Sequence, residues 1–239
     1  PTIHTQYETE TFLGKFQART RTYGKHTVKI AWPKRVLMRT NMSHLLSVLM
    51  GGQCDIDLVQ GCRLVELDLT AIESQFPGPR YGMSKIRDFL GAYNRPLIGG
   101  IIKPKIGLTP QQMADVAKQM ADGGVDFIKE DEILNDQDFC RFHERVPLIV
   151  KALEGYHVVY APCITEDGGG VWKRARQARA MGATAVHCNV WSGLGTYLDC
   201  RRHVELPLFF QKSGDRAFTR GHYSISYAVL CQLIHRIGC

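Results

Sequence analysis

The sequence lacks the features that mark membrane, secreted or zinc-binding proteins. No apolar run approaches the roughly 20 residues that span a bilayer, and the polar start PTIHTQYETE does not predict a signal peptide. The eight cysteines form no CxxC pair and have no spacing to histidine that suits zinc. They are scattered, often within apolar runs, as reduced and buried thiols are. We therefore expect a cytoplasmic protein with no membrane partner.

Basic residues outnumber acidic ones, 30 to 23, which gives a net charge of +7. A basic balance can indicate nucleic-acid binding, but the sequence has no helix-turn-helix, zinc-finger or RNP signature. The densest basic cluster, at residues 174–179, is typical of the outer face of a helix. We therefore predict no nucleic-acid partner, and an anionic small molecule as the substrate of the lysines described next.

The most informative stretch is a β-α-β unit over residues 97–132. An apolar run at 97–102 stops at Lys103 and Lys105, and a second run at 125–128 stops at the charged sequence KEDE. Between them, Thr109 and Pro110 predict a helix start, and the apolar residues that follow recur at helical spacing. Such a unit pairs its strands in parallel, so both strands end at the edge of the sheet that carries the chemistry of α/β folds.

At that edge the two lysines of the first strand are expected to meet Lys129, Asp131 and Glu132 from the second. Strand alternation predicts that Lys129 and Asp131 share one side and that Glu132 begins the loop. A solvated charge run, or strand-end lysines paired with the acids, would need no metal. The position directly after a buried strand, beside a second pair of lysines, instead favours a functional cluster.

The sequences IIKPKIGL and GGVDFIKEDE resemble the large subunit of ribulose-bisphosphate carboxylase (RuBisCO) and the RuBisCO-like proteins. The resemblance runs from about Val28 to the C-terminus. It implies that carbon dioxide carbamylates Lys129, and that the carbamate, Asp131 and Glu132 hold Mg²⁺. It also implies that Lys103 handles the proton at the enolising carbon of the substrate, and that Lys105 supports the reacting oxygens.

The chain departs from carboxylating RuBisCO at residues that hold the substrate. The family has a His-Arg pair and a further histidine after its fifth barrel strand, where this chain has Gln211, Lys212 and Asp215. Lys212 can grip a phosphate only as a point charge. The sequence MGGQ at 50–53 also lacks the asparagine that the family's first domain contributes to a partner's site, and the lysine base of a salvage enolase. The resemblance is therefore to the RuBisCO-like branch.

Further candidates lie at the same predicted edge. Asn189 follows the fourth strand and, with Gln211 and Lys212, is predicted to bind substrate. His187 is either an acid–base residue or a histidine of the core. Gly168–Gly170 either cradle a phosphate at a helix start or form a plain loop.

The predicted fold is α/β: a partial (β/α)8 TIM barrel over residues 97–239, preceded by a small α+β, ferredoxin-like domain over residues 1–96. In the first domain we expect antiparallel strands, one of them at 62–69. After residue 97 a β/α pattern of about 28 residues repeats through five units, and the last helix is expected at 222–237. A whole barrel takes about 250 residues, so we expect an incomplete barrel; an open five-stranded sheet is the alternative.

The leading hypothesis is a Mg²⁺-dependent RuBisCO-like enzyme that enolises a phosphorylated, sugar-like carbonyl substrate. One alternative is carboxylation of ribulose bisphosphate, and another is a non-catalytic binding module that keeps the fold. The resemblance also implies a homodimer or a dimer-based oligomer, in which the first domain of one subunit completes the site of the other.

Overall fold

The computed structural model describes residues 19–23 and 26–239. The remaining part of the predicted first domain lies outside the described residues. The described part begins with an antiparallel pair, β1 (Arg19–Tyr23) and β2 (Thr27–Ala31). Helix α2 (Met42–Met50) follows, and Asn41 caps it by accepting a hydrogen bond from the His44 backbone amide. The ferredoxin-like fold and the domain boundary at residue 96 stay predictions.

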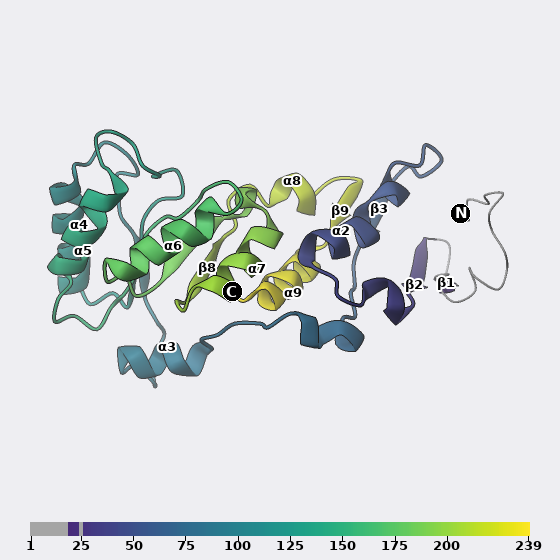
Figure 1. Cartoon of the computed structure of the whole chain (residues 1–239), viewed down its shortest axis with the longest axis horizontal. Coiled ribbons are helices and arrows are strands. Elements are labelled where there is room, and N and C mark those ends of the chain that lie inside the picture. Colours follow the sequence, from purple (N-terminus) through teal and green to yellow (C-terminus); the bar gives the residue numbers. More distant parts are fainter. Residues whose placement is uncertain (1–18, 24–25) are drawn as a thin grey trace.

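From residue 97 onward strands and helices alternate, as predicted. Figure 1 shows that the covering helices follow one another along the long axis of the molecule, with α4 and α5 at one end. The units are β4 (Gly99–Ile101) and α4 (Pro110–Asp122), β5 (Phe127–Lys129) and α5 (Phe142–Ala152), β6 (Val159–Ala161) and α6 (Gly170–Ala180), β7 (Val186–Asn189) and α7 (Leu194–His203), and β8 (Leu208–Gln211) with the short α8 (Arg216–Thr219).

The strands of these units run in parallel. Strands β4, β5 and β6 form one ladder, and β7 pairs with β8. A parallel bridge between Cys163 and His187 joins the two ladders, and the Ala185 amide donates to the Tyr160 carbonyl at 2.9 Å. The carboxyl ends of all five strands therefore lie along one edge, as the β-α-β pattern predicts.

Helix α4 shows how the sequence sets the first unit. The Thr109 hydroxyl accepts from the Gln112 amide, which confirms the predicted helix start, and the Gln112 side chain accepts from the Thr109 amide, which completes a capping box. Met113 and Ala117 are buried beneath the helix. Gly124, at φ 81°, ends the turn that leads into β5.

Two predicted elements, the strand at 62–69 and the helix at 222–237, are shorter in the structure than the sequence predicts. The helix is shortened to α9 (Tyr227–Ile237), and β9 (Tyr223–Ile225) precedes it. Strand β9 pairs in parallel, not antiparallel, with β3 (Cys62–Leu64). Ser226 is the physical cause: its amide donates to the Leu64 carbonyl at 2.7 Å, and its hydroxyl then caps α9. Because the partner turns into a helix there, the pairing stops at Leu64.

Shorter elements connect these units. The main apolar core lies between the sheet and its helices and continues under α2 and α9. A second, smaller apolar cluster includes Leu90, Val159 and Ala185. Among the described residues, no helix is long and apolar enough to cross a membrane. The connecting elements are the 3-10 turns η1 (Lys34–Leu37), η2 (Gly52–Cys54), η3 (Thr70–Gln75) and η4 (Val190–Ser192), and helix α3 (Met83–Leu90).

Candidate active site

The predicted cluster of lysines and acids forms at the carboxyl ends of β4 and β5. Ile101 pairs with Lys129, and the Ile102 amide donates to the Lys129 carbonyl at 3.0 Å, so the two strand ends are held side by side. Lys103 Nζ lies 2.5 Å from Asp131 Oδ2. Lys129 Nζ lies 3.6 Å from Glu132 Oε2 and donates to the Glu130 carbonyl at 3.0 Å. Two of the three predicted lysines thus pair with the two predicted acids.

Burial distinguishes Lys129 from Lys103 and from ordinary surface lysines. The side chain of Lys129 is 3% exposed, whereas that of Lys103 is 56% exposed. Burial lowers the pKa of Lys129, because an ammonium loses its hydration there, and the nearby charges of Glu132 and Asp131 only partly oppose this. Lys129 is therefore an amine with an increased neutral fraction, next to two carboxylates.

Two hydrogen bonds in series, which we call the relay, connect Gln211 at the end of β8 through Ser213 to Glu132. Gln211 Nε2 donates to Ser213 Oγ at 2.6 Å, and Ser213 Oγ donates to Glu132 Oε1 at 2.6 Å. Burial by itself raises the pKa of Glu132, but the hydrogen bond from Ser213 and the charge of Lys129 outweigh it and lower the pKa to about 2. Glu132 therefore stays ionised at every pH at which the protein would work.

The sequence does not predict that Ser213 belongs to the site. It lies two residues beyond β8 in an ordinary loop sequence, and nothing in its spacing marks it. Only the proximity of β5 and β8 across the sheet edge gives the serine its role.

The other predicted substrate residues make different contacts. Asn189 donates through Nδ2 to the Ser213 carbonyl at 3.2 Å and accepts from the Trp191 amide at 3.0 Å, so its amide ties two loops together. Lys212 Nζ lies 4.0 Å from Asp215 and 5.8 Å from the ring centre of Tyr227. Among the described residues, no hydrogen bond or ion pair joins the exposed Lys105 to the cluster. The substrate roles of all four residues, Gln211 included, stay predictions.

Glu130 faces the opposite side of β5, as strand alternation requires. Its fully buried carboxylate accepts from Arg145 of α5 at 2.9 and 3.0 Å, from the Tyr160 hydroxyl at 2.7 Å and from the Cys163 amide at 2.8 Å. The sequence KEDE is thus divided, with Glu130 anchoring the strand and the other three facing the site.

The donor set fits a hard divalent cation only under one condition. Among residues 19–23 and 26–239, no group of three or more histidine, cysteine, aspartate or glutamate side chains gathers to hold a metal. Asp131 and Glu132 provide two carboxylates, and the third neighbour is the amine of Lys129. A carbamate on that amine would complete an all-oxygen set of the kind that Mg²⁺ prefers.

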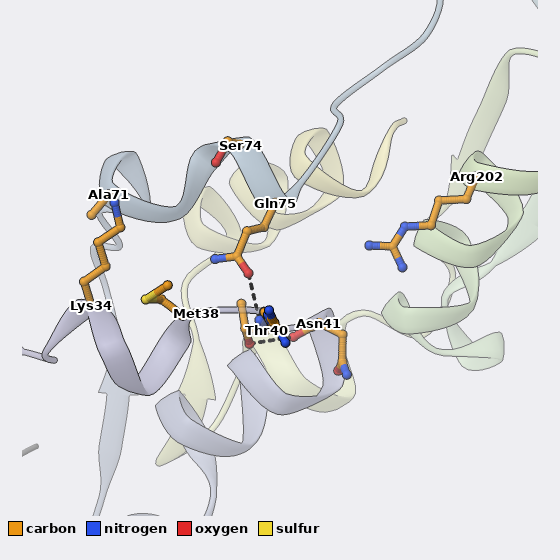
Figure 2. Close-up of a pocket in the computed structure, with 9 residues that line it drawn as sticks. Lys34, Met38, Thr40, Asn41, Ala71, Ser74, Gln75 and Arg202 are labelled. Carbon is orange, nitrogen blue, oxygen red and sulfur yellow. Dashed lines mark hydrogen bonds between the residues drawn. The ribbon is translucent and has the colours of Figure 1, made fainter.

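Two hollows elsewhere on the described surface are lined by other residues. One, of about 710 Å³, lies between α2, η3 and the end of α7, and Figure 2 shows Lys34 and Arg202 on opposite sides of it. The other, of about 650 Å³, includes Gly168 and Gly169. Gly170 does begin α6, as predicted, but the phosphate-binding role of Gly168–Gly170 stays a prediction.

Comparison with known proteins identifies the family of the chain. The family model described as ribulose bisphosphate carboxylase large chain, catalytic domain, matches residues 82–239. The chain is 36% identical over 201 residues to a ribulose bisphosphate carboxylase-like protein of Bordetella bronchiseptica. The aligned region covers 80% of this chain and 47% of that protein. The chain is also 32% identical over 200 residues to a 3-oxo-isoapionate-4-phosphate transcarboxylase/hydrolase of Xanthobacter autotrophicus. That aligned region covers 80% of this chain and 48% of that protein.

A solved structure gives the same result at the level of the fold. Octameric ribulose-1,5-bisphosphate carboxylase/oxygenase from Pyrococcus horikoshii superposes with a TM-score of 0.88 at 25% identity, covering 99% of this chain and 61% of that one. The chain spans about half the length of the curated relatives that it matches. This chain belongs to the RuBisCO large-chain family, and it contains part of the α/β catalytic domain of that family.

Proposed function

We propose that this protein is a Mg²⁺-dependent RuBisCO-like enzyme that removes a proton next to a carbonyl of a phosphorylated, sugar-like substrate. The observation that carries this proposal is the pairing of Lys103 with Asp131 beside the pairing of Lys129 with Glu132. A salt-bridged strand end would also show these pairs. It would not require a lysine to be buried with its pKa lowered.

In this proposal Lys129 carries a carbamate. The nitrogen electron pair of the neutral amine attacks the carbon of carbon dioxide, so that a C–N bond forms while one C=O π bond breaks and its electrons move to oxygen. An N–H bond then breaks and its proton leaves to water, which gives the carbamate anion. The lowered pKa of Lys129 supports this step, because only the unprotonated amine has the electron pair. The carbamate, Asp131 and Glu132 would then hold Mg²⁺, which would polarise the substrate carbonyl as a Lewis acid.

Lys103 is the proposed base. Its amine is half-exposed at the edge of the strands and is anchored to Asp131, so it can reach a substrate while it stays beside the metal ligands. To accept a proton the amine must first be neutral. Lys105 and Lys212 are the proposed contacts to anionic oxygens, and Asn189 and Gln211 would border the same edge.

The proposed substrate class rests on the positive charge of the protein and on its similarity to the Xanthobacter relative. The chain has a net charge of +7, and lysines lie at the ends of β4, β5 and β8. The Xanthobacter relative is named for a phosphorylated sugar acid. A phosphorylated carbonyl compound suits both observations.

Proton exchange in deuterated water tests the proposal without a named product. With Mg²⁺ and bicarbonate, the protein should exchange the hydrogen next to the carbonyl in at least one member of a panel of phosphorylated ketoses and keto acids. Lys103→Ala should lower the exchange rate by at least about 100-fold, as expected for loss of an acid–base group. Lys151→Ala, which removes an exposed lysine at the end of α5, is the matched control.

Exchange that survives Lys103→Ala would contradict the assignment of the base. Absence of exchange and of Mg²⁺ binding would favour the non-catalytic module. Fixation of labelled carbon dioxide on ribulose bisphosphate would favour the carboxylase alternative.

A dimer or a dimer-based oligomer is also proposed. The Pyrococcus relative is octameric, which supports an assembly of this kind. Analytical ultracentrifugation that finds only monomers at micromolar concentration would contradict it.

A further inference from the structure

His187 is buried in an unusual way. The residue lies on β7 and is 0% exposed, and neither ring nitrogen has a hydrogen-bond partner among the described residues. A buried polar group without a partner destabilises the folded state. Most histidines in a core avoid this by donating one N–H to a carbonyl, so the ring of His187 is not explained by packing alone.

The register of the sheet places His187 on the same side as Lys129. Lys129 pairs with Ala161 on β6, and Cys163, two residues further along, bridges to His187 on β7. Residues two apart share one face of a strand, so all four side chains face the interior side, opposite to Glu130 and Tyr160. In barrels of this kind alternate strands fill one interior layer, and β5 and β7 are alternate strands.

The charged groups that act on His187 are known. Burial and the positive charges of Lys129 and Arg145 lower the pKa of His187, while the charge of Glu132 and the nearby Glu130 backbone carbonyl oppose them. Glu130 is also close along the chain, but its carboxylate is turned away and bound by Arg145 and Tyr160. In either protonation state the imidazole carries at least one N–H donor.

Lys129 as an amine cannot satisfy the N–H of His187. An ammonium has three donors and no acceptor, and the Lys129 ammonium already faces the Glu130 carbonyl and Glu132. A carbamate on the same nitrogen has two acceptor oxygens. The Glu130 backbone carbonyl also lies near the ring, but it accepts from Lys129 Nζ and forms no well-aligned hydrogen bond with His187. The carbamate oxygens would therefore provide the acceptor that the His187 N–H lacks.

We propose that His187 is a positioning residue that donates its ring N–H to the carbamate formed on Lys129 and fixes the direction in which its oxygens point. This inference rests on the proposed function, because it needs the carbamate. It goes beyond that proposal by naming a residue outside the ligand set that stabilises the modification. Residues that orient metal ligands in this way typically change metal affinity by about 10- to 100-fold.

Carbon-13 NMR of the full chain with labelled carbon dioxide tests the proposal without any substrate or turnover. The carbamate signal gives the apparent affinity for carbon dioxide. His187→Leu, which has no donor, should weaken that affinity by about tenfold or more. His187→Gln, which keeps an N–H donor, should restore most of it. Cys163→Ala, on the same face next to His187, controls for looser packing and should leave the affinity unchanged.

A second measurement does not depend on the variants folding well. In wild-type chain labelled with ¹⁵N-histidine, the His187 N–H signal, assigned with His187→Gln, should move when the carbamate forms. Equal carbamate affinity in His187→Leu and wild type, or a His187 signal that does not respond, would overturn this inference and leave the metal site standing. No carbamate in the wild-type chain, with Lys129→Met as the blank, would overturn both.

Discussion

Lys129 and Glu130 are adjacent in sequence but have opposite environments. Lys129 faces the interior edge with its charge only partly balanced, whereas Glu130 has four hydrogen bonds on the other side of the strand. The anchored residue fixes the position of its neighbour, because β5 cannot rotate without breaking the contacts to Arg145. Glu130 thus stabilises the end of β5, and the adjacent Lys129 is the residue that faces the site.

Removing the charge of Glu130 should strongly destabilise the fold. Glu130→Gln leaves Arg145 buried without a partner charge, and breaking a buried pair in this way costs about 3–5 kcal/mol. Glu205→Gln is the control, because Glu205 is 54% exposed, forms ion pairs with Arg80 and Arg179, and should contribute less than about 1 kcal/mol. Urea unfolding compares the two, and similar free energies of unfolding would contradict the anchoring role.

The titration of Glu132 should depend on Ser213. The pKa in the folded state, about 2, lies below the ordinary value of 4.5. Ionised Glu132 therefore contributes stability that is fully present above about pH 4.5 and is lost as the pH falls toward 2. Ser213→Ala should raise the pKa of Glu132 and move this loss to higher pH. NMR of the glutamate carboxyl in metal-free buffer measures it, with Ser224→Ala as the control; an unchanged midpoint would argue against the relay.

The elements differ in how far the sequence predicts them. Helix α4 could be predicted because the Thr109–Pro110 start and the apolar spacing act within one segment. The lysines and acids could be placed together because parallel strands end at one edge. Strand β9 could not be predicted, because the apolar pattern from 223 to 237 fits a single helix and only its pairing with β3 changes the first turn. Ser213 escaped prediction for the same reason: its partner Glu132 is 81 residues away.

The Thr109 cap of α4 should contribute measurably to the free energy of unfolding. Thr109→Ala removes the acceptor for the Gln112 amide and should lower the free energy of unfolding by about 1 kcal/mol. Thr109→Ser retains the hydroxyl and should lose much less. Thermal or urea unfolding of both variants distinguishes them, and equal losses would indicate that the hydroxyl does not stabilise the helix.

At the scale of the whole molecule, early and late segments of the chain are joined. Strand β3 pairs with β9, Gln232 of α9 donates to the Leu67 carbonyl at 2.8 Å, and Arg201 of α7 donates to the Gly78 carbonyl at 2.9 Å. In Figure 1, β3 and β9 lie next to each other although about 160 residues separate them. The segment at 62–78 is therefore expected to unfold together with α9.

Hydrogen exchange tests this coupling. Leu230 of α9 is fully buried, and Leu230→Ala should cost about 2–5 kcal/mol. The variant should speed amide exchange in residues 62–64 as well as in 227–237. Val28→Ala, at a 54% exposed position on β2, is the control and should change neither segment. Faster exchange confined to 227–237 would show that the two segments open independently.

Calorimetric titration with Mg²⁺ tests the metal site most directly. The account predicts that the wild-type chain binds Mg²⁺ when bicarbonate is present, that binding is much weaker without it, and that both Lys129→Met and Asp131→Asn abolish the bicarbonate-dependent binding. Equal binding with and without bicarbonate, or undiminished binding by Lys129→Met, would contradict the claim that Lys129, Asp131 and Glu132 form one metal site.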